Sequence, residues 1–458
     1  MKRPSGFFHR FLLAGASLVV VAGLGCSGGG GAQTGTGGSS TDSGVDMGPV
    51  GSGGQSAGGT GGGASGGVNG GSGGMPVTDA GSGSGGGGAS GGNDASAVDA
   101  HADAPAGGDA AGPGVWTGTW AAAPDGTCGA FTGQTLRTIV HTSIGGSAAR
   151  VRVSNVRGGG PLHITNVHLA QRTTGSSIDV ATDKALTFAG QPDVTVAAGM
   201  VALSDGADFV VKPLSDVAIS FYVMSSSGGT CQQNPFQTNY AAGGNMVSAA
   251  TLGGGGGGYV YVLGLDVQNP DAEGAVVALG ASITTGFRTS NDTNKRWPNL
   301  LAAKMAAANR TIGVLNEGIS GDGTTGALNR FNRDVLSQTN VKWVIFSDNP
   351  INDLGGSTPE GDIAMIKTMM SMAHAKGVKF LCSTLTPYTP VEPKRTTVIN
   401  FIKSAGSGCD GIIDQDTATH NPAAPTQWAP QFNSGDGLHP NAAGMQAIAD
   451  IVDLTIFK

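Results

Sequence analysis

The stretch Gly274-Ala-Val-Val-Ala-Leu-Gly-Ala-Ser-Ile-Thr-Thr-Gly286 sets the fold class of the C-terminal part of the chain. Residues 275–279 form a continuous apolar run, which is typical of a strand buried on both faces. After this run, helix and strand patterns alternate to the end of the chain. Such alternation predicts a parallel sheet with helices on both faces, in which ligands bind at the carboxyl ends of the strands.

The other expected elements of this part follow at short intervals. Further strands are expected at 311–315, 341–346, 378–382 and 411–413. Helices are expected at 296–308, 325–337, 361–375, 398–404 and 442–455.

Three candidate residues follow the first three strands. Ser282 lies on a tight turn that exposes its hydroxyl beside helix N–H groups, which favour developing negative charge. Gly321 can bring its N–H close to an oxyanion, and the amide of Asn352 can donate to the same oxygen. Taken singly, each has a simpler explanation, namely a helix cap, a turn glycine or an Asx turn.

A fourth block, Asp436-Gly-Leu-His-Pro440, lies near the C-terminus. A carboxylate and an imidazole three residues apart on one loop can hydrogen-bond directly. The carboxylate then fixes the tautomer of His439 and stabilises the imidazolium formed when the ring accepts a serine proton. A metal site would need a third ligand; His420 is available, but no recognised spacing supports it, so no metal or cofactor is expected.

In this order, the four blocks resemble those of the SGNH hydrolases, the GDSL-type esterases, over the whole segment from residue 275 to the end. The family's helix opening also resembles Arg296-Trp-Pro298. The resemblance implies a flavodoxin-like three-layer α/β domain. It also implies one role for each block residue: a nucleophile at Ser282, a general base at His439 oriented by Asp436, and oxyanion donors at Ser282, Gly321 and Asn352.

Two positions depart from the family pattern. The family's first block reads Gly-Asp-Ser, and Ala281 stands where that aspartate normally braces the nucleophile turn. Its loss either loosens Ser282 or moves the support elsewhere. The third block begins with Gly in the family and with Pro350 here, and proline fixes φ and offers no N–H. The α/β-hydrolase alternative is weaker, because Thr284 replaces the second Gly of its Gly-x-Ser-x-Gly elbow.

An all-β unit is expected at 114–268, followed by the hydrolase domain at 269–458. The strands of the all-β unit are short, rich in Val, Ile, Thr and aromatic residues, and separated by Gly, Ser, Asp and Pro. They are expected at 135–142, 149–153, 162–169, 193–196, 216–224 and 259–267. We interpret the unit as a sandwich of jelly-roll type. The segments Thr117-Gly-Thr-Trp-Ala-Ala-Ala-Pro124 and Leu136-Arg-Thr-Ile-Val-His-Thr142 resemble the β domain that precedes a subset of these enzymes.

The N-terminus resembles an export signal over residues 1–25. A basic start is followed by an apolar run at 11–24 that ends in small residues. The sequence Gly23-Leu-Gly-Cys26 resembles a bacterial lipobox, which implies lipidation of Cys26. The alternative is a simple secretory signal with an incidental cysteine.

Residues 26–113 are mostly Gly, Ser, Ala, Thr and Asp and carry few large apolar side chains. Such a segment cannot bury enough surface to offset its ordering entropy, so a disordered linker is expected. Together with the signal, it predicts an exported protein, either an outer-membrane or cell-surface lipoprotein or a secreted or periplasmic one. The membrane would then be contacted only through the N-terminal lipid.

Four further cysteines form an even set, as in exported proteins with disulfides. Their segregation suggests Cys128–Cys231 and Cys382–Cys409, although the second pair could equally be two free thiols. The chain has 25 Lys and Arg against 32 Asp and Glu, and no basic run beyond its extreme N-terminus. Phosphate binding needs clustered Lys and Arg, so nucleic acid is not an expected partner.

The function expected from these patterns is hydrolysis of short acyl esters, above all acetyl esters, by an exported serine esterase. An acetylated polysaccharide is one candidate substrate, by analogy alone. The alternative is a surface glycan-binding lipoprotein with a degenerate hydrolase fold, motivated by Ala281 and Pro350. The β unit could be a lid, a scaffold or a carbohydrate-binding module, and only Trp116 and Trp120 hint at aromatic stacking.

Overall fold

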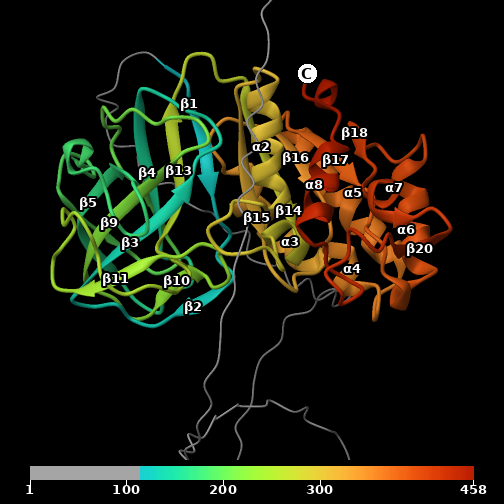
Figure 1. Ribbon diagram of the computed structural model, residues 1–458, viewed down its shortest axis with the longest axis horizontal. Helices are drawn as coiled ribbons and strands as arrows, with labels where there is room; N and C mark the ends of the chain where they lie inside the picture. The colour runs from blue at the N-terminus through green and yellow to red at the C-terminus, as the bar shows by residue number, and fades with distance from the viewer. Residues whose placement is uncertain (1–113) are drawn as a thin grey trace, which may run out of the picture. The chain divides into compact units, whose positions relative to one another are not determined.

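The computed structural model describes residues 114–458 (Figure 1). The predicted signal peptide of residues 1–25, the lipidated Cys26 and the linker that ends at residue 113 lie outside these residues. The described residues group into one compact unit. Among their helices, none combines the length and the apolar character needed to cross a membrane.

The C-terminal half is built on a five-stranded sheet with the order β15-β14-β16-β17-β18. Every strand pair in it is parallel. The strands are β14 (Gly274–Gly280), β15 (Ile312–Gly318), β16 (Val341–Phe346), β17 (Lys379–Ser383) and β18 (Gly411–Ile413). The strand order reverses after β15, so the carboxyl ends of β14 and β16 meet at the switch point where such sheets bind ligands.

Helices cover the sheet in two groups (Figure 1). α2 (Trp297–Ala307) packs on α8 (Ala442–Asp450), whereas α5 (Pro359–Ala375) packs between α3 (Thr324–Phe331) and α6 (Lys394–Lys403). A parallel sheet with such helices confirms the predicted α/β fold. Several helix ends differ from the prediction. α6 starts four residues before the predicted residue 398, and α3 ends at Phe331 and continues to Leu336 as a π-helix. The hydroxyl of Thr358 accepts the N–H of Gly361 and starts α5 two residues early, and α8 stops at Asp450, before a short 3-10 turn.

The N-terminal half is all-β, with antiparallel sheets, as predicted. One sheet has the order β1-β13-β4-β8, with strands Trp116–Ala121, Val262–Gln268, Ala148–Ser154 and Val201–Leu203. The second has the order β11-β3-β9-β5-β6, with strands Tyr240–Gly243, Gln134–His141, Asp216–Ser225, Leu162–Gln171 and Lys184–Ala185, and β7 (Asp193–Val196) also pairs with β5. The small third sheet joins β12 (Tyr259–Val260), β10 (Gly229–Gln232) and β2 (Gly126–Cys128).

One predicted strand of this half is two strands in the structure. The run at 259–267 is interrupted at Tyr261, whose φ is 60°. β12 therefore pairs with β10, and β13 pairs with β1 and β4. The left-handed conformation at one residue re-aims the chain from one sheet to the next, and a run of apolar residues does not reveal such a break.

Each half contains one disulfide, and the β half buries two tryptophans. Cys128 and Cys231 form a disulfide between β2 and β10, and Cys382 and Cys409 form the second one in the other half, which confirms both suggested pairs. Trp116 and Trp120 are only 9% and 7% exposed. Because both indole rings are buried, neither offers a surface on which a sugar could stack.

The two halves meet along the edge of the parallel sheet. β1 lies against β15, and a Cβ on Gly313 would collide with the carbonyl oxygen of Gly118. The Ser143 hydroxyl accepts the N–H of Val314 at 2.9 Å. The edge strand β15 is thus covered, and an open edge is otherwise a template for unwanted strand pairing.

Candidate active site

Ser282 is the first residue of the short helix α1 (Ser282–Thr285), directly after β14. It is 8% exposed, and its Oγ lies 2.9 Å from Nε2 of His439. The N–H of a residue at the start of a helix has no acceptor within that helix. Ser282 therefore combines a hydroxyl in contact with a base and a backbone donor at the carboxyl end of β14.

Asp436 holds the other side of the His439 ring. Its Oδ2 lies 2.8 Å from Nδ1 of His439, and its Oδ1 accepts the backbone N–H groups of Leu438 and His439. Partial burial acts to raise the pKa of Asp436, but these backbone donors and the imidazole outweigh it and the pKa is strongly lowered. A carboxylate that stays ionised fixes the orientation of the ring. Arg288 also reaches Oδ2, but its exposed side chain makes that ion pair weak.

The support that Ala281 cannot provide comes from Asp348, directly after β16. Oδ1 of Asp348 accepts the Ala281 N–H at 2.9 Å and the Thr284 hydroxyl at 2.6 Å. Oδ2 accepts the Ile283 N–H at 2.9 Å. Asp348 is 2% exposed. The carboxylate that braces the nucleophile turn has therefore moved to a neighbouring strand end, which is one of the two outcomes expected from Ala281.

Pro350 is accommodated by a change of local structure. The third block is a short helix, α4 (Asn349–Asp353), with Pro350 in its first turn. The missing N–H of proline costs nothing there, because the first turn of a helix leaves its N–H groups unpaired. Pro350 therefore does not break the segment that carries Asn352.

The two remaining block residues lie on neighbouring loops. The Asp322 N–H bonds to the Ile319 carbonyl across a turn in which Gly321 has a φ of 78°, a conformation that favours glycine. The exposed side chain of Asn352 donates from Nδ2 to the Asp322 carbonyl at 2.9 Å. An amide carries two N–H groups, so this bond engages one of them and holds Asn352 beside the Gly321 loop.

Arg330, on α3, joins these loops and was not singled out from the sequence. Its guanidinium donates to the Gly280 carbonyl at 3.0 Å, the Glu317 carbonyl at 2.7 Å and the Asp322 carboxylate at 2.8 Å. It is 5% exposed. One buried cation thus ties the end of β14, the end of β15 and the Gly321 loop together. A single Arg within a helical pattern gives no sign of such a role.

Two aromatic residues extend the site toward the β half. The Phe287 ring, after α1, lies 4.6 Å from the His439 ring between centroids. Phe236 packs edge-on against Phe287 at 6.2 Å. Phe236 belongs to the loop between β10 and β11, so a residue of the β half lies two ring contacts from the imidazole.

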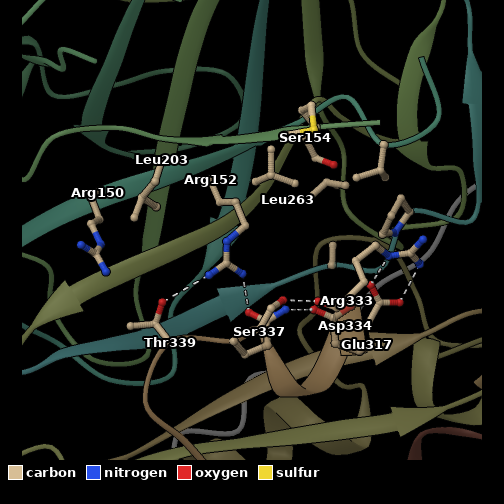
Figure 2. Close-up of a pocket in the computed structure, with 16 residues that line it drawn as sticks. Arg150, Arg152, Ser154, Leu203, Leu263, Glu317, Arg333, Asp334, Ser337 and Thr339 are labelled. Atoms are coloured by element: carbon tan, nitrogen blue, oxygen red, sulfur yellow. Dashed lines mark hydrogen bonds and ion pairs between the residues drawn. The ribbon is translucent and has the colours of Figure 1, made fainter. Parts of the chain in front are cut away.

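A separate cavity of about 300 Å³ lies between the two halves (Figure 2). Arg152 crosses it from β4 and donates to Gln338 at 2.6 Å and Thr339 at 3.2 Å. Glu317, 1% exposed, accepts from Gln338 at Oε1, and Oε2 has no hydrogen-bond partner within the described part of the chain. Ser282, His439 and Asp436 do not line this cavity. It is therefore distinct from the candidate active site.

The buried carboxyl of Glu317 should make the stability of the protein depend on pH. Burial, with the nearby Asp334 charge, raises the pKa of Glu317 well above its usual value. Because the unfolded chain releases this proton at lower pH than the folded one, the unfolding free energy should fall as pH rises above the usual carboxyl range. Glu317→Gln should flatten this fall, so the unfolding free energy of the variant relative to that of the wild type should be higher at pH 8 than at pH 5, measured by calorimetry. Glu360→Gln, at an exposed position, is the control, and equal slopes for wild type and Glu317→Gln would contradict the prediction.

The site thus consists of a serine, a histidine and an aspartate in one hydrogen-bonded chain at the carboxyl end of a parallel sheet. Such an arrangement is typical of serine hydrolases. Residues 278–447 match the model of the GDSL-like lipase/acylhydrolase family, and this part of the chain is a domain of that family. In residues 114–458, no group of three or more His, Cys, Asp or Glu side chains is arranged to hold a metal ion.

Three solved structures illustrate what this chain is similar to. They are a lipase/acylhydrolase from Enterococcus faecalis (22% identity, 39% of this chain and 92% of that chain, TM-score 0.32), a G-D-S-L lipolytic protein from Veillonella parvula (17%, 39% and 94%, 0.32) and the acetylxylan esterase Axe2 from Geobacillus stearothermophilus (20%, 39% and 92%, 0.33). No curated protein matches the chain.

Proposed function

We propose that the protein is a serine esterase that hydrolyses short acyl esters, above all acetyl esters. The observation that carries the proposal is the hydrogen-bonded chain from Ser282 Oγ through the His439 ring to the Asp436 carboxylate. It provides a nucleophile, a base that accepts its proton and a carboxylate that orients the base.

The reaction follows from this geometry. His439 accepts the hydroxyl proton while Ser282 Oγ attacks the ester carbonyl, and the tetrahedral intermediate carries negative charge on the former carbonyl oxygen. The Ser282 and Gly321 N–H groups and the Asn352 amide are the proposed donors to that oxygen. His439 then gives its proton to the departing alcohol. Water, deprotonated by His439, attacks the acyl-enzyme, releases the carboxylic acid and restores the Ser282 hydroxyl.

Two features support an active site over the degenerate alternative. That alternative rested on Ala281 and Pro350, and the first is compensated by Asp348 whereas the second fits the start of α4. The preference for a small acyl group is supported by the close surroundings of Ser282, which is nearly buried and faces a histidine covered by Phe287.

The proposal is tested with p-nitrophenyl esters of increasing acyl length, from acetate to decanoate. We expect kcat/KM to be highest for the shortest esters and to fall by about tenfold or more toward decanoate, because a crowded site excludes the longer chain. A fluorophosphonate should label the protein at Ser282, read by mass spectrometry. The esterase proposal would be refuted if every ester were hydrolysed only at its uncatalysed rate in buffer and the fluorophosphonate did not label Ser282.

We further propose that the esterase is exported and anchored through lipid on Cys26, or otherwise secreted or periplasmic. The apolar run and lipobox-like sequence support this location, and so do two disulfides, which persist in oxidising compartments. Cell fractionation tests it, and recovery of the full-length chain from the cytoplasm would refute it.

A further inference from the structure

The loop between β10 and β11, residues 233–239, forms a wall beside the candidate active site. It is connected to His439 through two aromatic rings. Phe236 contacts Phe287, and Phe287 contacts the His439 ring. The two phenylalanines are far apart in the sequence. Phe236 lies between β10 and β11 of the all-β half (Figure 1), and Phe287 follows the helix that begins with Ser282. Phe236 therefore brings a residue of the β half close to the candidate active site.

This loop is held in place by Asp292, which lies in the segment between α1 and α2. The Asp292 carboxylate accepts the Thr238 N–H and the Thr238 hydroxyl, both at 2.7 Å, and the Gln237 amide at 2.5 Å. The Asp292 N–H in turn donates to the Phe236 carbonyl at 3.1 Å. Arg296, 6% exposed, donates to the Pro235 carbonyl at 2.6 Å. A wall fixed in this way loses little conformational freedom when it binds a ligand.

The backbone of this wall is also unusual. Phe236 and Asp292 have φ values of 49° and 62°, in the left-handed region. A bulky aromatic residue rarely adopts that conformation, and such residues persist where the surrounding contacts over-determine them, often at ligand sites. Here those contacts are the bonds to Asp292 and the packing of Phe236 on Phe287.

A groove of about 510 Å³ is lined by residues of this loop. It has exposed carboxamides at Gln233, Asn234 and Asn291, the Phe236 ring, and the backbone of residues 255–257. None of the residues that line it carries a formal charge. Carboxamides both donate and accept hydrogen bonds, as sugar hydroxyls do, and an aromatic ring offers an apolar surface. Its volume falls in the usual range of ligand pockets, about 300–1,000 Å³.

We propose that this groove binds neutral sugar residues of the alcohol part of the substrate, next to the residue whose ester is cleaved. This inference rests on the proposed esterase function and assigns its substrate to acetylated neutral glycans. The lack of charged side chains in the groove disfavours a uronate chain or a phospholipid headgroup, because no Lys or Arg lines it to form the charge-assisted hydrogen bonds that bind anions most strongly.

The test compares three acetyl esters: an acetylated xylo-oligosaccharide, an acetylated oligogalacturonate and p-nitrophenyl acetate, which has no sugar. We expect the neutral oligosaccharide to have a kcat/KM at least about tenfold above that of the charged one. In the double variant Asn234→Ala/Asn291→Ala, and in Phe236→Ala, the ratio of kcat/KM for the xylo-oligosaccharide to that for p-nitrophenyl acetate should fall by about tenfold. Asn329→Ala, at an exposed position of α3, should keep the wild-type ratio.

The outcomes separate the two proposals. Failure to hydrolyse p-nitrophenyl acetate would refute the esterase function itself. Hydrolysis of p-nitrophenyl acetate together with a preference for the oligogalacturonate, or with an unchanged ratio in the double variant, would leave the esterase and refute the groove. The double variant changes exposed side chains only, so it remains informative if Phe236→Ala fails to fold.

Discussion

Ser282→Ala should lower kcat for p-nitrophenyl acetate by at least about 10⁴-fold. The methyl group cannot attack a carbonyl, and the proton that His439 would accept is gone. The unfolding free energy should change by only about 1 kcal/mol, because the substitution removes one hydrogen bond, between Oγ and Nε2 of His439. Initial rates and thermal unfolding of the same preparations measure both effects.

The matched control for this substitution is Ser290→Ala, an exposed serine on the segment that follows α1. It should keep the wild-type rate. If Ser282→Ala retained the wild-type rate while folding normally, the nucleophile would have to be another group and the assignment of His439 as its base would be lost with it.

Asp348→Ala should have the second largest effect. The substitution leaves three buried donors without an acceptor, namely the N–H groups of Ala281 and Ile283 and the hydroxyl of Thr284. The unfolding free energy should fall by about 3 kcal/mol. Since the same bonds shape the turn that presents Ser282, kcat/KM should also fall by about 100-fold, because small displacements of a nucleophile are costly. Chemical denaturation and p-nitrophenyl acetate kinetics provide the two measurements.

Position 281 allows a sharper test of Asp348. Ala281→Asp alone should destabilise the protein, because a second carboxylate would enter a turn already occupied by one. Combined with Asp348→Ala, it should cost less than the sum of the two single changes, since the carboxylate returns to the place where the family carries it. Strict additivity would show that the two positions do not substitute for each other. Asp208→Ala, at an exposed aspartate of the β half, is the control for loss of a carboxylate.

The long apolar runs of the C-terminal half were sufficient to predict its sheet. Buried strands such as β14 and β16 are recognised by their composition, and the bounds predicted for β16 and β18 agree with the structure. Short elements were missed, for example α4 (Asn349–Asp353) and the hairpin of β19 (His420–Asn421) and β20 (Ala424–Trp428). These segments lack the paired isoleucines that mark β18 and are too short to show a period, so tertiary contacts determine their conformation.

The candidate site divides in a similar way. Ser282, Asp436 and His439 could be predicted because each lies in a recognisable block, and the structure places all three within hydrogen-bond contact. Asp348 stands in the third block but could not be recognised as a brace, because its role depends on the distance between two strand ends. The contact of Phe236 with Phe287 joins two halves of different fold class, and no local pattern reports it.

The close approach of Gly118 to Gly313 limits how this protein can be altered or divided. A side chain on Gly313 would collide with the backbone of Gly118, and the hydroxyl that satisfies the Val314 N–H belongs to the opposite half. The hydrolase half is therefore not expected to fold properly when it is expressed alone or fused to a different domain. Cut free, it would present an unpaired strand to other molecules. Substitutions along β1 and β15 must be chosen together, so any directed evolution of this enzyme should treat both halves as one unit.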